Sequence, residues 1–70
     1  MANNMNLDIG QALKDLRQDK RLTQAEVAKK AGISTNYYAR IERGDTGTSI
    51  AIFAKIIKAL DTKSSKVLPF

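Results

Sequence analysis

The sequence predicts an all-α chain that folds as one compact bundle of four to five helices. Apolar residues recur at helical spacing along most of the chain. Capping residues precede these segments and glycines follow several of them, whereas the only proline is Pro69. A chain of 70 residues forms one domain at most, and a domain of this size buries only about 60% of its extended surface.

The amino-acid inventory excludes several classes of site. The chain has no cysteine and no histidine, so it lacks thiolate metal ligands, disulfides, the commonest zinc ligand and the commonest general base. Its acidic residues are scattered, and no glycine-rich phosphate loop is present. We therefore expect no enzyme, no metal, no other cofactor and no small-molecule ligand.

The charge balance favours a polyanionic partner. The net charge is +5, from 12 Lys and Arg against 7 Asp and Glu, which suits nucleic acid or an acidic membrane surface and also agrees with simple solubility. No apolar run approaches the roughly 18 residues that span a bilayer. The N-terminal stretch MANNMNLDIG lacks the basic and apolar regions of a signal peptide, so we expect a cytoplasmic protein without a membrane partner.

The first helix is indicated by a stripe of apolar residues at i, i+4 and i+7, namely Ile9, Leu13 and Leu16. Residues 1–6 are polar and are expected to be flexible, so the domain is assigned to residues 7–70. Asp8 is predicted to be the N-cap or an acid of the first turn. The helix should end near Lys20, because the apolar spacing breaks at Leu22.

Two short helices are predicted next, over residues 24–31 and 35–43. Thr23 and Glu26 form a capping box at the start of the first, and Gly32 supplies the left-handed residue that ends it. Ser34 caps the second, and Gly44 ends it. The inner side of the second helix is Tyr38 and Ile41, and its outward side is Thr35, Asn36, Ala39, Arg40 and Arg43.

A loop from Asp45 leads to a fourth helix that Ser49 caps. Its predicted buried stripe is Ile50, Phe53, Ile56, Ile57 and Leu60. A last short turn is predicted in SSKVLPF, at the end of the chain.

The link between the two short helices, Gly32-Ile33-Ser34, forces a sharp crossing that is typical of a helix-turn-helix. In that geometry the second helix is presented to the major groove of DNA. Asparagine pairs with adenine, arginine with guanine, and threonine bonds a base or touches a thymine methyl. The outward residues of the second helix therefore suit base reading.

Short matches to a known family are spread over residues 9–60: Ile9-Gly10, Leu13, Leu16-Arg17, Leu22-Thr23-Gln24, Val27-Ala28, Ala31-Gly32-Ile33-Ser34, Ile41-Glu42-Arg43-Gly44, Ser49-Ile50, Phe53, Lys55-Ile56 and Ala59-Leu60. In combination they resemble the lambda-repressor-like helix-turn-helix family of Cro/cI type (XRE). The resemblance implies base reading by Ser34, Thr35, Asn36 and Arg40. It implies phosphate contacts by Gln24, Arg43 and the loop at Thr46, with Tyr37 as a further candidate. It also implies a partly buried ion pair between Arg17 and Glu42.

Several of these residues have a plainer alternative. Ser34 is also a helix cap, and one hydroxyl can serve both roles. Asn36 can be no more than a helix-start residue, and Arg40 and Arg43 can be a solvated helix face. Tyr37 can stack, reach a phosphate or cover the helix flank.

The sequence departs from the family pattern at Tyr38, Arg21, Thr48 and Asp61-Thr62. Tyr38 stands where an aliphatic residue is usual, so its hydroxyl needs a polar outlet. Arg21 replaces a frequent glycine, which puts the turn after the first helix in doubt.

A homodimer interface is predicted near the C-terminus, from Ile52, Ile56, Val67, Leu68 and Phe70. A small monomer cannot easily cover all of these side chains, and a leftover apolar patch usually marks an interface. The resembled family also often dimerises through this region. In the alternative interpretation, the apolar residues of the last four positions simply close the monomer core.

Taken together, these features predict a sequence-specific double-stranded DNA-binding transcriptional regulator, acting as a dimer on a near-palindromic operator. A phage repressor and a controller protein of a restriction–modification system both fit a chain of this length, and an antitoxin or plasmid regulator fits as well. The alternative from another class is a protein-binding module that has kept the fold. The basic outward face of residues 35–43 favours DNA.

Overall fold

The computed structural model describes residues 4–60. Its elements are α1 (Asn4–Asp19), α2 (Gln24–Ala31), α3 (Thr35–Arg43) and α4 (Ile50–Leu60). The described part of the chain contains no strand, so the all-α prediction is confirmed. The turn predicted in SSKVLPF lies outside the described residues, as do Val67, Leu68 and Phe70.

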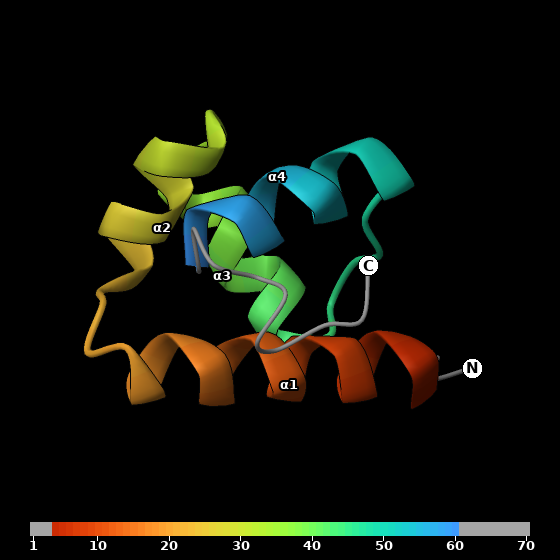
Figure 1. Cartoon of the computed structure of the whole chain (residues 1–70). Coiled ribbons are helices and arrows are strands. Elements are labelled where there is room, and N and C mark those ends of the chain that lie inside the picture. Colours follow the sequence, from red (N-terminus) through yellow and green to blue (C-terminus); the bar gives the residue numbers. More distant parts are fainter. Residues whose placement is uncertain (1–3, 61–70) are drawn as a thin grey trace.

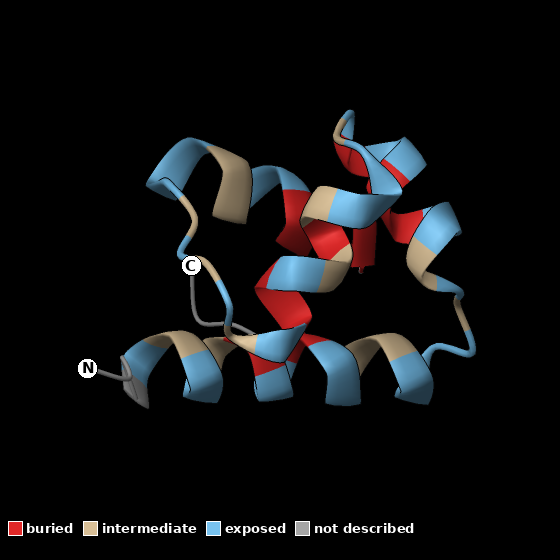
Figure 2. Cartoon of the chain, turned by 180° about the vertical axis from the view of Figure 1, so that it is seen from behind, coloured by how far each residue is buried: buried red, intermediate tan, exposed pale blue. Residues whose placement is uncertain are grey.

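The helices enclose a single core, with α1 along one side of the molecule (Figure 1). α1 packs on α3, whereas α2 packs on both α3 and α4. Buried residues lie where the helices face one another, and the outer side of each helix is exposed (Figure 2). The core consists of Leu13, Val27, Ala28, Ala31, Tyr38, Ile41, Ile56, Ile57, Ala59 and Leu60.

Tyr38 lies in the centre of this core, as predicted from its spacing to Ile33, and it is 0% exposed. Its hydroxyl is buried and makes no hydrogen bond of regular geometry, but it lies near the charged groups of Arg17 and Glu42. Burial, and then the nearby Glu42 carboxylate, raise the pKa of Tyr38 well above its ordinary value.

The predicted caps of α2 are confirmed. The Thr23 hydroxyl accepts a hydrogen bond from the Glu26 amide at 3.1 Å, and the Glu26 carboxylate accepts one from the Thr23 amide at 2.8 Å. The bond from the Thr23 backbone lowers the pKa of Glu26. Gly32 ends the helix with φ 74°, a left-handed conformation that glycine adopts without strain.

The caps of the next two helices are also as predicted. Ser34 Oγ accepts from the Tyr37 amide at 3.0 Å, and Ser49 Oγ accepts from the Ile52 amide at 3.1 Å. Gly44 ends α3 with φ 79°.

The start of α1 differs from the prediction. The helix begins at Asn4, so residues 4–6 are helical, and Asp8 lies inside the helix instead of at its N-cap or in its first turn. The first turns of α1 pack beside the loop after α3: Asn6 is half-buried, and its side chain lies next to Gly47. This packing favours helix where the sequence is only polar.

The prediction of the buried stripe of α4 is partly wrong. Ile50 is 89% exposed, because it is the first residue of α4 and the buried side chains of that helix all lie in its second half. Phe53 is half-buried against the core. Ile56 is 0% exposed; since it belongs to the core of its own chain, its assignment to a dimer interface is corrected.

Two backbone positions set the path of α1. A side chain at Gly10 would place its Cβ 2.4 Å from the Glu42 carbonyl oxygen, so α1 approaches the backbone of α3 closely. Arg21, in the turn that leads to α2, has φ 57° and is the one non-glycine residue with positive φ in the described part of the chain. This is the position where the resembled family often has glycine.

Candidate nucleic-acid interface

α2 and α3 form the helix-turn-helix that the sequence predicts. They pack on each other, and the link between them is tied by a hydrogen bond from the Ile33 amide to the Ala28 carbonyl at 3.0 Å. Tyr38, Ile41 and Glu42 face inward from α3. Four polar residues of α3 are exposed along its outward side: Thr35, Asn36, Arg40 and Arg43.

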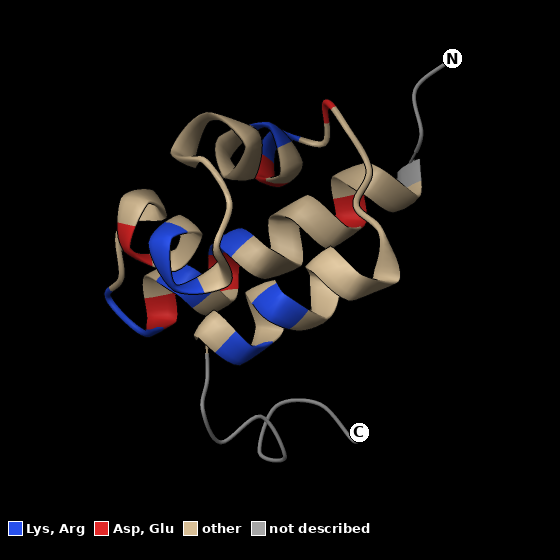
Figure 3. Ribbon diagram, turned by 90° about the horizontal axis from the view of Figure 1, so that it is seen from above, with Lys and Arg blue, Asp and Glu red and all other residues tan. Residues whose placement is uncertain are grey.

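The outward side of α3 is basic. α3 has no acid in its first turn and carries Arg40 and Arg43 in its last turn. Its one acid, Glu42, is only 7% exposed. The basic residues of α3 and those of α4 lie on opposite sides of the molecule (Figure 3). The exposed positive charge of α3 is therefore concentrated on the face that carries Thr35 and Asn36.

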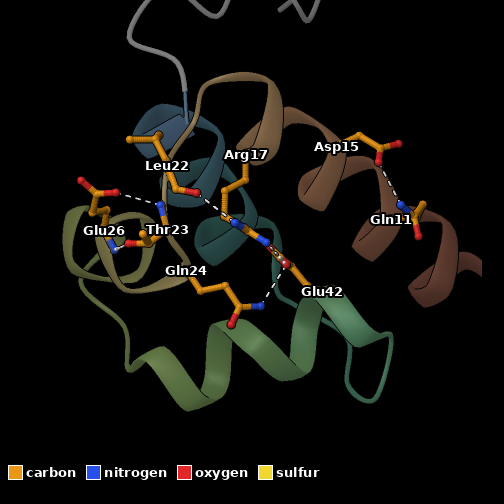
Figure 4. Close-up of polar contacts among 8 residues, drawn as sticks. All are labelled: Gln11, Asp15, Arg17, Leu22, Thr23, Gln24, Glu26 and Glu42. Carbon is orange, nitrogen blue, oxygen red and sulfur yellow. Dashed lines mark hydrogen bonds and ion pairs between the residues drawn. The ribbon is translucent and has the colours of Figure 1, made fainter.

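A buried polar network holds α3 in place (Figure 4). Arg17 on α1 donates two hydrogen bonds to the Glu42 carboxylate, from Nε to Oε2 at 2.6 Å and from Nη2 to Oε1 at 3.1 Å. The same guanidinium donates to the Leu22 carbonyl at 2.9 Å. The ion pair implied for Arg17 and Glu42 is thus present, with side-chain exposures of 13% and 2%.

The network fixes the charge states of both partners. The hydrogen bond to Glu42 raises the pKa of Arg17. Burial disfavours the charged form of Glu42, but the hydrogen bonds that its carboxylate accepts outweigh burial, so the pKa of Glu42 is lowered. Glu42 therefore remains a carboxylate inside the protein.

Gln24 is the third member of this network. It is the first residue of α2, and its amide nitrogen donates to Glu42 Oε1 at 3.0 Å. In the free protein this amide therefore braces α3. Gln24 also lines a hollow of about 610 Å³ between α1, the start of α2 and the end of α3, together with Lys14, Arg43 and Asp45.

The remaining predicted residues fall into an exposed group on α3 and a half-buried group, Tyr37 and Thr46. Ser34, Thr35 and Asn36 lie together at the start of α3, with Arg40 further along the same helix. Tyr37 is half-buried against the core, which fits the alternative that it covers the helix flank. Thr46 lies in the loop after α3, half-buried, and its hydroxyl donates to the Gly47 carbonyl at 3.4 Å.

Sequence reasoning missed one residue of this site, Lys14, and one contact, the pair between Arg43 and Asp45. Lys14 lines the hollow from α1, and no motif in α1 marks it. Asp45 pairs with Arg43, whose Nε donates to Asp45 Oδ2 at 2.8 Å. Opposite charges on both sides of a helix-ending glycine, as in Arg43-Gly44-Asp45, are a signal that could have indicated this pair.

Other classes of site find no support among the described residues. Residues 4–60 contain no group of three or more side chains suited to hold a metal ion. None of the four helices described is both long enough and apolar enough to cross a membrane.

Comparison with known proteins gives three informative relatives. The chain is 32% identical over 62 residues to the immunity repressor protein of Bacillus phage phi105, covering 89% of this chain and 43% of the relative. It is 36% identical over 61 residues to the transcriptional regulator SinR of Bacillus subtilis strain 168, covering 86% and 55%. It is 32% identical over 71 aligned positions to the control protein C.BamHI of Bacillus amyloliquefaciens, covering 100% and 88%.

The chain thus spans about half the length of the phage repressor and of SinR. The family model described as helix-turn-helix matches residues 13–67, which include α2, α3, α4 and the second part of α1. The chain belongs to the XRE-type helix-turn-helix family.

Proposed function

We propose that this protein is a sequence-specific, double-stranded DNA-binding transcriptional regulator. The observation that carries the proposal is the outward side of α3, which is exposed and basic and belongs to the second helix of a capped helix-turn-helix. A helix of this kind enters the major groove with its N-terminal residues nearest the bases. A regulator of transcription acts where the DNA is, which supports a cytoplasmic location.

Within this function, base edges would be read by Ser34, Thr35, Asn36 and Arg40. Arg43, Gln24 and the loop at Thr46 would contact phosphates, with Tyr37 as a further candidate. Phosphate contacts set orientation and affinity, whereas base contacts carry the sequence information. The shared hollow of Gln24 and Arg43 supports their assignment to one stretch of DNA backbone.

The relatives support regulation and leave its biological setting open. A phage repressor, a transcriptional regulator and a control protein are all represented by name. The match over most of the control protein supports a regulator of the restriction–modification controller type, and the match to the immunity repressor supports a phage repressor. An antitoxin or plasmid regulator remains an alternative. The family and these relatives are transcription regulators, in agreement with the expectation that the chain is not an enzyme.

We further propose that the regulator works as a homodimer. One helix-turn-helix covers few base pairs, and two copies related by a two-fold axis read a near-palindromic site with recognition helices about 34 Å apart. Ile52 on α4 is half-buried and remains a candidate for the interface. Val67, Leu68 and Phe70 are the other candidates.

The dimer is tested by sedimentation at protein concentrations of tens of micromolar. A dimeric wild type should become a folded monomer when Ile52→Glu or Leu68→Glu is introduced, with operator binding lost and random-DNA binding largely kept. A wild type that stays monomeric, and binds a half-site as tightly as the full site, would contradict the dimer and leave the DNA-binding function standing.

DNA binding itself is tested by selecting bound sites from a random DNA pool. Recovery of a common near-palindromic sequence is expected. Binding to random duplex should also weaken steeply as salt increases, because phosphate contacts release counterions. No enrichment, together with no salt-dependent binding to random duplex, would favour a protein-binding module with the same fold.

A further inference from the structure

Arg43 and Asp45 form an ion pair at the end of α3, beside its outward side. Arg43 Nε lies 2.8 Å from Asp45 Oδ2, and the two side chains are 57% and 51% exposed. We propose that Asp45 sets the affinity for DNA: its carboxylate holds the Arg43 guanidinium in the free protein and competes with DNA phosphate for it. This inference rests on the proposed function, because it takes Arg43 as a phosphate contact.

The backbone holds Asp45 in this position. Gly44 has φ 79°, and its amide donates to the Ile41 carbonyl at 3.1 Å. The Asp45 amide donates to the Arg40 carbonyl at 3.0 Å, which closes the turn at the end of the helix. Because its backbone is tied to α3, Asp45 stays beside Arg43 when α3 meets DNA.

The ion pair is weak enough to be displaced. An exposed ion pair of this kind favours the paired over the separated side chains by only about two- to fivefold, because both charges remain hydrated. A DNA phosphate that takes over the guanidinium leaves the Asp45 carboxylate next to the negatively charged backbone. The pairing in the free protein and the repulsion in the complex act in the same direction, since both lower the affinity.

The effect of Asp45 is independent of DNA sequence. It acts through a phosphate contact, which contributes affinity without sequence information. By reducing binding to every DNA, Asp45 lowers occupancy of random sites and leaves discrimination to the base-reading residues. The displaced carboxylate also takes up a cation from solution, which offsets part of the counterion release from DNA.

The experiment compares Asp45→Asn with a control, Asp19→Asn, which removes the same charge from the last residue of α1. The first turns of α1 lie near Asp45, so its last residue is remote from it. Leu7 lies against Gly44, and Asp19 is about 18 Å further along that helix. Dissociation constants for random duplex are measured over a range of salt concentrations. Asp45→Asn should bind about two- to tenfold more tightly than wild type, with a salt slope steeper by up to about one. Asp19→Asn should change both quantities less.

The Arg43→Ala background identifies the mechanism. In that background Asp45→Asn should gain less affinity than it does with Arg43 present, because no guanidinium is left to release and only the repulsion between the carboxylate and the DNA backbone is removed. An equal gain in both backgrounds would overturn the inference and assign Asp45 a general charge effect. Arg43→Ala could bind DNA more weakly while Asp45→Asn, introduced into the otherwise wild-type protein, changes the affinity no more than Asp19→Asn does. That result would overturn the inference about Asp45 and leave the proposed function standing. Unchanged binding of random duplex by Arg43→Ala would instead contradict the phosphate contact, and the role of Asp45 with it.

Discussion

The guanidinium of Arg17 on α1 lies 2.6 Å from the carboxylate of Glu42 on α3, whose side chain is only 2% exposed. Gln24, at the start of α2, donates to the same carboxylate at 3.0 Å. The Glu42 carboxylate therefore links α3, which carries the candidate base-reading residues, to both α1 and α2. The orientation of α3 depends on this contact as well as on the apolar core.

Removing one partner of this pair should destabilise the protein strongly. Arg17→Met leaves the Glu42 carboxylate buried without its main partner, at a cost of roughly 3–5 kcal/mol. Adding Glu42→Leu removes the stranded charge and should recover much of the loss. Chemical or thermal unfolding of the two variants measures both effects.

The matched control is Asp15→Ala on the exposed side of α1, where Asp15 accepts a hydrogen bond from Gln11 at 2.9 Å. A surface contact of this kind should change stability by no more than about 0.5 kcal/mol. If Arg17→Met cost no more than this control, the ion pair would have no structural role.

Stability should fall in acid, and Glu42 should account for part of the fall. The pKa of Glu42 is lower in the folded protein than its ordinary value, which is about 4.3 in an unfolded chain. As the pH falls through this range the unfolded state takes up the proton first, so unfolding becomes more favourable. Thermal unfolding of wild type should therefore shift to lower temperature below pH of about 4.

Glu42→Gln should be less stable than wild type at neutral pH and should lose less stability on acidification. The control is Glu26→Gln, which changes an exposed capping carboxylate and should alter the pH dependence less. Parallel curves for wild type and Glu42→Gln between neutral pH and pH of about 3 would show that Glu42 does not contribute.

Gly10→Ala should destabilise the protein, although alanine is the better helix former by about 1 kcal/mol. Its Cβ would lie 2.4 Å and 2.5 Å from the carbonyl oxygens of Glu42 and Ile41, so α1 would have to move away from α3. Overpacking of this kind costs about 1–3 kcal/mol. A higher melting temperature for Gly10→Ala would contradict the close approach of the two helices.

Arg21→Gly should stabilise the protein. Arg21 has φ 57°, and the left-handed conformation costs a residue with a Cβ about 1 kcal/mol or more. Arg21→Ala makes the same change of charge but keeps the Cβ, so it serves as the control and should give no such gain. Equal melting temperatures for the two variants would argue against strain in this turn.

The sequence was most informative where local chemistry decides the structure. The capping box at Thr23, the Ser34 cap and the helix-ending glycines each depend on a few neighbouring residues, and all were predictable. The inward direction of Tyr38 follows from helical spacing. The Arg17–Glu42 pair joins residues far apart in the chain, and it was accessible only through the family resemblance.

The features that sequence reasoning missed depend on contacts between distant segments. α1 begins at Asn4, where its first turns pack beside the loop after α3, whereas the predicted apolar stripe begins only at Ile9. Ile50 has the spacing of a core residue but lies beyond the end of the core. The stripe of apolar residues gives the face of α4 that is buried, but it does not give how far along the helix burial extends.

The central claim is that α3 reads DNA sequence, and the most direct measurement is the affinity of two arginine variants for a selected operator and for random duplex. Arg40→Ala should cost about 1–3 kcal/mol on the operator and little on random DNA. Arg43→Ala should weaken binding to both and reduce the salt slope by about one. If both variants lost equal affinity on both DNAs, the assignment of base reading to Arg40 and of phosphate contact to Arg43 on α3 would be wrong.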